Sequence, residues 1–139
     1  MSSRATQNQS LNYGTEWMSI NPPIQVSTTD RFESEARQLG KRYRRIRLDI
    51  QPLIEQLESG ELPGAQIPGM DHMLFKVRVK NSNIQKGKSG GYRVIYYVKT
   101  EDKILLVTIY SKSDKPDISA TEIRDILKRA EESSDQDEA

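Results

Sequence analysis

The chain has 139 residues, of which 35% are hydrophobic and 29% charged, so we expect one modest core beneath a heavily charged surface. It contains no cysteine, which excludes disulfides, thiolate zinc sites and cysteine nucleophiles. No run approaches the roughly 18 apolar residues that cross a bilayer, and residues 1–12 lack the apolar stretch of a signal peptide. We therefore expect a cytoplasmic protein that does not contact a membrane.

The net charge of +1 hides an uneven distribution along the chain. Residues 30–118 contain 17 basic and 12 acidic side chains, whereas residues 119–139 contain 3 basic and 7 acidic ones. From His72 to Thr100 there are seven Lys and Arg residues and no Asp or Glu. Such a segment creates a positive field that suits a polyanion. The alternative is a solvated strand face that only keeps the protein in solution.

The first third of the chain predicts an extension, a strand and a helix. Residues 1–23 are dominated by polar residues and end in two prolines, which predicts disorder. Residues 24–27 alternate between apolar and polar and predict a short strand. Asp30, with Glu33 three residues later, is a capping pattern for a helix that Gly40 should end.

A second helix follows, and Pro52 within it should kink it or mark where it restarts. Its apolar face consists of Ile46, Ile50, Leu53, Ile54 and Leu57. Residues 61–71 contain two Pro and two Gly and predict a loop. The period then changes to two, which predicts strands at 73–80, 91–99 and 103–111. A last helix should begin at Ser119, with Glu122 as its capping partner.

This order of elements predicts an α+β fold: an N-terminal helical hairpin on one face of a small twisted antiparallel sheet, and a C-terminal helix. We expect the helices to share that one face. The predicted domain covers residues 24–130, and an acidic disordered tail covers 131–139.

Basic side chains collect on the opposite face of the predicted sheet. In the strand at 73–80, alternation turns Lys76, Arg78 and Lys80 away from the helices together. A tight turn near residues 100–102 places Arg93 opposite Ile109 or Tyr110, and the preceding hairpin places it near Arg78. Lys112 shares a face with Tyr110 because it lies two residues further along the strand.

Clustered arginines beside lysines and a tyrosine indicate phosphate chemistry by side chains. His72 is the only histidine and we expect it to be incidental; no pattern of metal ligands occurs, so we expect neither metal nor cofactor. RNA can be cleaved without metal, because its 2′-hydroxyl can attack the adjacent phosphate. Arginine pairs with phosphate oxygens in a bidentate manner. Lysine or tyrosine could transfer protons if cationic surroundings lower their pKa.

Three segments resemble one known family: residues 74–79 (LFKVRV), 88–97 (KSGGYRVIYY) and 106–115 (LVTIYSKSDK). They resemble the RelE/ParE toxin superfamily, and its HigB-like RelE branch in particular, over residues 24–130. The resemblance implies a RelE-like fold and the toxin of a type II toxin–antitoxin system. Such toxins enter the 30S A site of the ribosome, cleave mRNA there without metal as endoribonucleases, and are neutralised by a cognate antitoxin.

The resemblance also implies which residues act. The implied catalytic residues are Lys76, Arg78, Arg93, Tyr110 and Lys112. We expect Lys80, Lys88 and Lys115 to bind RNA. The general base stays open between Tyr110 and Lys112. Two departures from the family stand out: a longer loop at 81–90, and no match for the tyrosine that some members carry in the final helix. Two alternatives also remain, a ParE-like toxin acting on DNA gyrase and a degenerate toxin that only binds its antitoxin.

Overall fold

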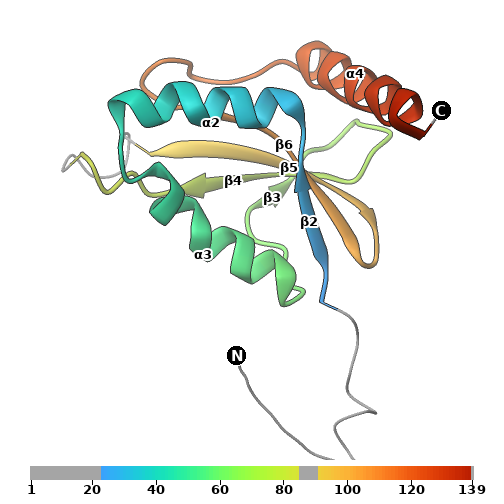
Figure 1. Ribbon diagram of the computed structural model, residues 1–139, viewed down its shortest axis with the longest axis horizontal. Helices are drawn as coiled ribbons and strands as arrows, with labels where there is room; N and C mark the ends of the chain where they lie inside the picture. Colours follow the sequence, from blue (N-terminus) through green and yellow to red (C-terminus); the bar gives the residue numbers. More distant parts are fainter. Residues whose placement is uncertain (1–22, 85–90, 139) are drawn as a thin grey trace, which may run out of the picture.

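The computed structural model describes residues 23–84 and 91–138, which form one sheet with three helices (Figure 1). The α+β class that the sequence predicts is confirmed. Along the chain the elements are β2 (Gln25–Thr28), α2 (Asp30–Arg42), α3 (Ile46–Glu58), β3 (Ala65–Gln66), β4 (Leu74–Val79), β5 (Tyr92–Thr100), β6 (Lys103–Ser111) and α4 (Ala120–Glu138).

The sheet is mixed, with strand order β2-β6-β5-β4-β3. β2 runs parallel to β6, so that Gln25 pairs with Lys103 and Thr28 with Leu106. The other neighbouring strands are antiparallel. Our prediction of a wholly antiparallel sheet was therefore wrong at this edge, because the chain passes through both helices and three strands before β6 returns beside β2.

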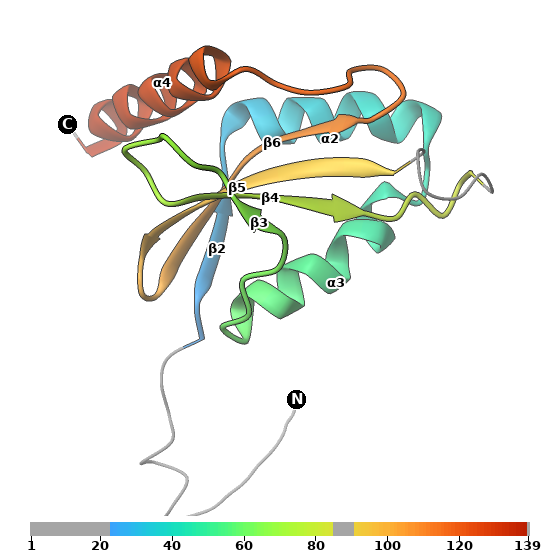
Figure 2. The same cartoon turned by 180° about the vertical axis from the view of Figure 1, so that it is seen from behind.

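The helices cover both faces of the sheet, not one. The α2–α3 hairpin packs on a core that includes Phe32, Leu57, Val94 and Leu106. On the opposite face, Ile123 and Leu127 of α4 pack against residues of the strands, namely Leu74, Ile95 and Val107. α4 lies toward the end of the molecule opposite the α2–α3 turn (Figures 1 and 2). Arg78, on the same face as α4, is exposed.

Three details of the predicted helices differ in the structure. Thr29 is the N-cap of α2, because its Oγ1 accepts a hydrogen bond from the backbone N–H of Phe32 at 2.9 Å. Asp30, which we predicted as the cap, lies in the first turn, where a carboxylate is still favourable. α2 continues past Gly40 to Arg42, and α3 runs without a break through Pro52.

The predicted loop at 61–71 contains the short strand β3, which pairs with β4. Gly64 allows this close pairing: its φ is +94°, and a Cβ there would lie 2.4 Å from the carbonyl oxygen of Lys76. α4 begins as predicted, with the N–H of Glu122 donating to Ser119 Oγ at 3.1 Å.

The predicted outer segments, residues 1–23 and 131–139, lie partly outside the described part of the chain. α4 continues to Glu138, beyond residue 130 where we predicted the domain to end. Residues 1–22 lie outside the described part of the chain, so the predicted N-terminal extension stays a prediction. Among the residues that the structure describes, no helix is both long and apolar enough to cross a membrane.

Candidate functional site

Three polar side chains form a row across neighbouring strands on the face away from the helical hairpin. Arg78 of β4 is the direct partner of Arg93 of β5, and Arg93 is the direct partner of Tyr110 of β6. Of the two partners predicted for Arg93, Ile109 and Tyr110, the structure has Tyr110, and the predicted proximity of Arg93 to Arg78 is confirmed. Side chains directly opposite each other on one face have Cβ atoms about 4.5–5.5 Å apart, so this row brings two guanidinium groups and a phenol together.

Arg93 is buried, with 7% of its surface exposed. Its Nη1 donates to the carbonyl oxygen of Tyr92 at 3.2 Å, and no described carboxylate forms an ion pair with it. Burial lowers the pKa of Arg93, and the nearby charge of Arg78 lowers it further. A buried cation without an anion is costly for the fold.

The glycine before Tyr92-Arg93 has a steric reason. A Cβ at Gly91 would lie 2.6 Å from the carbonyl oxygen of Val79 and 3.7 Å from Arg93 Nη1. Only glycine therefore lets the start of β5 lie this close to the end of β4. The close approach keeps Arg78 and Arg93 paired near the end of the β4–β5 ladder.

Tyr110 is buried as well, and its pKa is raised to about 12, first by burial and then by the charge of Asp117. The charge of Arg93 acts in the opposite direction but does not outweigh the burial. We expected cationic surroundings to lower the pKa of a proton-accepting tyrosine. The structure places Tyr110 in the opposite state, a phenol that keeps its proton near neutral pH and can donate a hydrogen bond.

A carboxylate that the sequence reasoning missed completes the cluster. Asp117, from the β6–α4 loop, accepts a hydrogen bond from Lys76 Nζ at 2.9 Å through its Oδ1 atom. The Tyr110 hydroxyl lies 3.5 Å from the same oxygen. The hydrogen bond from Lys76 lowers the pKa of Asp117, and so does one from the backbone N–H of Ile118. The basic face is therefore not free of acids, because the loop supplies one.

The remaining predicted site residues differ in their contacts. Lys112 Nζ donates to the carbonyl oxygen of Pro116 at 2.9 Å. Lys115 forms an ion pair with Glu122 at 2.9 Å, and its ammonium lies 5.8 Å from the centre of the Tyr110 ring. Lys80 is exposed just after β4. Lys88 lies outside the described residues.

His72 packs edge-on against Tyr97, with ring centres 4.9 Å apart, away from the row. Within residues 23–84 and 91–138, no three His, Cys, Asp or Glu side chains come together as possible metal ligands.

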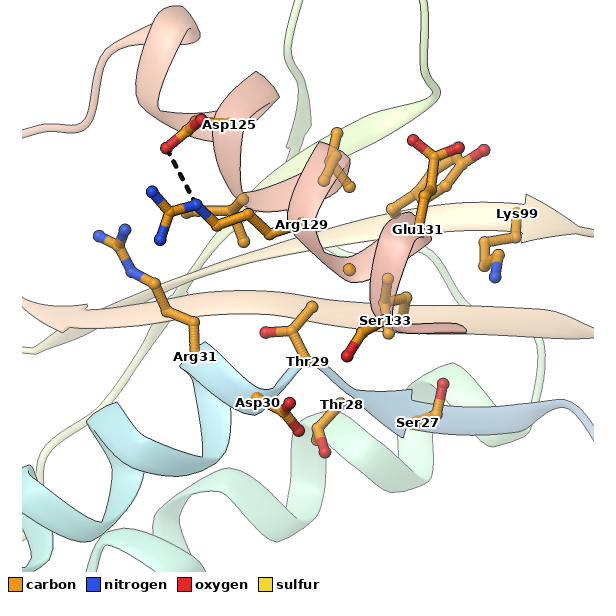
Figure 3. A pocket seen from close by; sticks show the side chains of 15 residues that line it. Ser27, Thr28, Thr29, Asp30, Arg31, Lys99, Asp125, Arg129, Glu131 and Ser133 are labelled. Atoms are coloured by element: carbon orange, nitrogen blue, oxygen red, sulfur yellow. Dashed lines mark ion pairs between the residues drawn. The ribbon is translucent and has the colours of Figure 1, made fainter. Parts of the chain in front are cut away.

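A pocket of about 620 Å³ lies elsewhere, between the start of α2 and the second half of α4 (Figure 3). Arg31, Lys99 and Arg129 line it from three different elements, together with acidic side chains. Arg129 forms an ion pair with Asp125 at 3.6 Å. None of the predicted site residues lines this pocket.

Comparison with known proteins gives one family. A family model described as the RelE toxin of the RelE/RelB toxin–antitoxin system matches residues 36–139. The match includes β4, β5, β6 and the loop that carries Asp117, and so the whole cluster described above. No curated protein matched the chain.

Proposed function

The chain belongs to the RelE toxin family of toxin–antitoxin systems, and from this premise we propose that it cleaves mRNA in the 30S A site of the ribosome without a metal ion. Membership of the family supports the role of a toxin and implies an antitoxin partner. We also propose that it acts on the ribosome, that its substrate is mRNA, and that it belongs to the narrower HigB-like branch.

The observation that carries the proposal is the buried guanidinium of Arg93. Its desolvation is not offset by a described carboxylate, and Arg78 stands directly beside it in the ladder. An incoming phosphate would supply the missing negative charge. Two arginines can hold the non-bridging oxygens of one phosphate by charge-assisted hydrogen bonds and stabilise the charge that develops on them during the reaction.

The proposed reaction is an intramolecular transesterification of RNA. The 2′-oxygen bonds to the adjacent phosphorus as its proton leaves, the bond from phosphorus to the 5′-oxygen breaks, and that oxygen takes up a proton. The products are a 2′,3′-cyclic phosphate and a 5′-hydroxyl. In this scheme Arg78 and Arg93 bind the phosphate, the Tyr110 phenol donates a hydrogen bond to it, and Lys76 supplies a proton or positive charge to the leaving oxygen.

The proposal is tested by adding the purified protein to translating ribosomes. A parallel reaction uses pre-formed mRNA–ribosome complexes at a constant magnesium concentration. We expect new mRNA ends within A-site codons, carrying 5′-hydroxyl groups, and none on the same mRNA without ribosomes. Intact mRNA on the ribosome, together with inhibition of gyrase-dependent supercoiling, would instead favour the ParE-like alternative. Intact mRNA with tight antitoxin binding alone would favour a degenerate toxin.

A further inference from the structure

The two oxygens of the Asp117 carboxylate have different surroundings. Oδ1 accepts hydrogen bonds from Lys76 Nζ at 2.9 Å and from the N–H of Ile118 at 2.8 Å, and the Tyr110 hydroxyl lies 3.5 Å away. Oδ2 has no hydrogen-bond partner among the residues that the structure describes. The Asp117 side chain is 65% exposed. The carboxylate is therefore fixed through one oxygen and open to a ligand through the other.

This open oxygen lies beside the row that would hold a phosphate. Tyr110 is the register partner of Arg93, and its hydroxyl lies 3.5 Å from Asp117 Oδ1. Lys76 lies two residues before Arg78 on the same face of β4, so it approaches Asp117 from the other side. A phosphate bound by the two arginines would have its adjacent 2′-hydroxyl within the reach of this loop.

The other candidates for proton acceptor fit less well. Tyr110 keeps its proton because burial raises its pKa to about 12. The Nζ atom of Lys112 already donates to the Pro116 carbonyl oxygen, and that of Lys76 donates to Asp117, so both amines are engaged as hydrogen-bond donors. Asp117 is the one carboxylate that contacts the cluster within the described residues, and as a carboxylate it is ionised at neutral pH and can accept a proton.

We propose that Asp117 is the proton acceptor of the cleavage reaction, held in place by hydrogen bonds from Lys76 and from the backbone N–H of Ile118. This inference rests on the proposed function. The Asp117 carboxylate takes the proton of the 2′-hydroxyl as the 2′-oxygen bonds to phosphorus. The phosphorus–O5′ bond breaks, and the 5′-oxygen takes a proton from the Lys76 ammonium. The proton on Asp117 then passes to Lys76 through their hydrogen bond, which restores the pair for the next reaction.

The first test compares Asp117→Asn with Asp117→Glu in single-turnover cleavage on mRNA-programmed ribosomes. Asparagine can still accept hydrogen bonds from Lys76 and Ile118 but cannot take up a proton at neutral pH, so we expect a loss of about 10²- to 10⁴-fold in the cleavage rate. Asp117→Glu should retain more activity than Asp117→Asn. The toxin concentration that half-saturates the ribosomes should stay within about threefold of wild type, because the arginines that bind phosphate are unchanged.

The second test separates the two proton transfers. An mRNA with sulfur in place of the scissile 5′-oxygen has a leaving group that needs no proton. Lys76→Ala should regain on this substrate the part of its lost rate that is due to protonation of the leaving group, whereas Asp117→Asn should stay slow.

Two results would overturn the inference while leaving the proposed function intact: Asp117→Asn cleaving natural mRNA at the wild-type rate, or Asp117→Asn restored to that rate by the sulfur substrate. The first would show that the carboxylate is not needed, and the second that it acts on the leaving group. Absence of cleavage by the wild-type protein itself would overturn the proposed function, and the inference with it.

Discussion

Two parts of the molecule are rich in positive charge, yet they use it differently. Residues 37–47, around the α2–α3 turn, contain six Lys and Arg residues and no acid, and all six are exposed. The sheet contains fewer cations per residue, but one of them, Arg93, is buried in register with a second arginine and a tyrosine. Charge density alone therefore does not distinguish the proposed site from other basic surface. The burial of Arg93 does, because an exposed cation stays hydrated at little cost in free energy, whereas a buried one loses its hydration.

The largest difference between the two parts should appear in RNA cleavage. We expect Arg93→Ala to lose about 10²- to 10³-fold in rate, the usual effect of removing one preorganised donor for a developing charge. Arg44→Ala, at the exposed turn, should stay within a few-fold of wild type. Growth arrest on expression, and cleavage rates of the purified proteins, give the comparison. Equal losses in the two variants would show that general electrostatic attraction dominates over the buried site.

The sequence predicted much of this row because strand alternation and hairpin register are local properties. Tyr110, one of the two partners predicted for Arg93, is its partner even though the β5–β6 ladder has two irregularities, between Ile95 and Tyr96 and between Val98 and Thr100. The two shifts cancel: Thr100 pairs with Lys103 and Arg93 with Tyr110, seven residues along each strand.

Other features could not be read from the sequence. Asp117 reaches Lys76 across 41 residues from a loop without periodicity, so no pattern could place it. The parallel pairing of β2 with β6 depends on strand order, which alternation does not reveal. The placement of α4 on the second face has the same origin, since an apolar stripe does not say which face of a sheet it covers.

Replacing a glycine with alanine should change the stability of the two regions in opposite directions. Gly91→Ala at the sheet would bring a Cβ to 2.6 Å from the Val79 carbonyl oxygen, so the strands must separate. We expect a loss of about 1–3 kcal/mol in the free energy of unfolding. In Gly40→Ala within α2, the new Cβ would lie 3.6 Å from Ile46 Cγ2, an ordinary contact. This change should stabilise the protein by about 0.5–1 kcal/mol through helix propensity. Urea denaturation measures both; a stable Gly91→Ala protein would refute the close approach of β4 and β5.

The exposed cations should contribute to affinity rather than to the chemical step. In a variant that combines Lys41→Ala, Arg44→Ala and Arg47→Ala, the single-turnover rate of bound complexes should not change. Its binding to ribosomes should depend less steeply on salt, by about 0.7–0.9 in the log–log slope for each phosphate contact that is lost. Filter binding over a range of salt concentrations measures this slope. A reduced chemical rate with an unchanged slope would contradict the division of roles between the two regions.

The smallest expected effect concerns the ion pairs that join α2 to α4. Hydrogen bonds from Arg31, and then from Lys115, lower the pKa of Glu122 below its usual value of 4.5. A lowered carboxyl pKa stabilises the fold above pH 4.5, and this contribution is lost as the pH falls through the folded-state pKa. Glu122→Gln should therefore cost about 0.5–1 kcal/mol near pH 7. Thermal unfolding should show that the difference from wild type disappears in acid; a difference that persists there would point to packing.

The most direct test of the central claim, that Arg93 is kept for a phosphate and not for the fold, is the free energy of unfolding of Arg93→Met without RNA. Methionine fills a similar space and removes a buried charge that has no described carboxylate partner. We predict a variant at least as stable as wild type, by up to about 3 kcal/mol, that cleaves mRNA on the ribosome about 10²- to 10³-fold more slowly. A loss of several kcal/mol would show that Arg93 holds the sheet together, and would contradict this account.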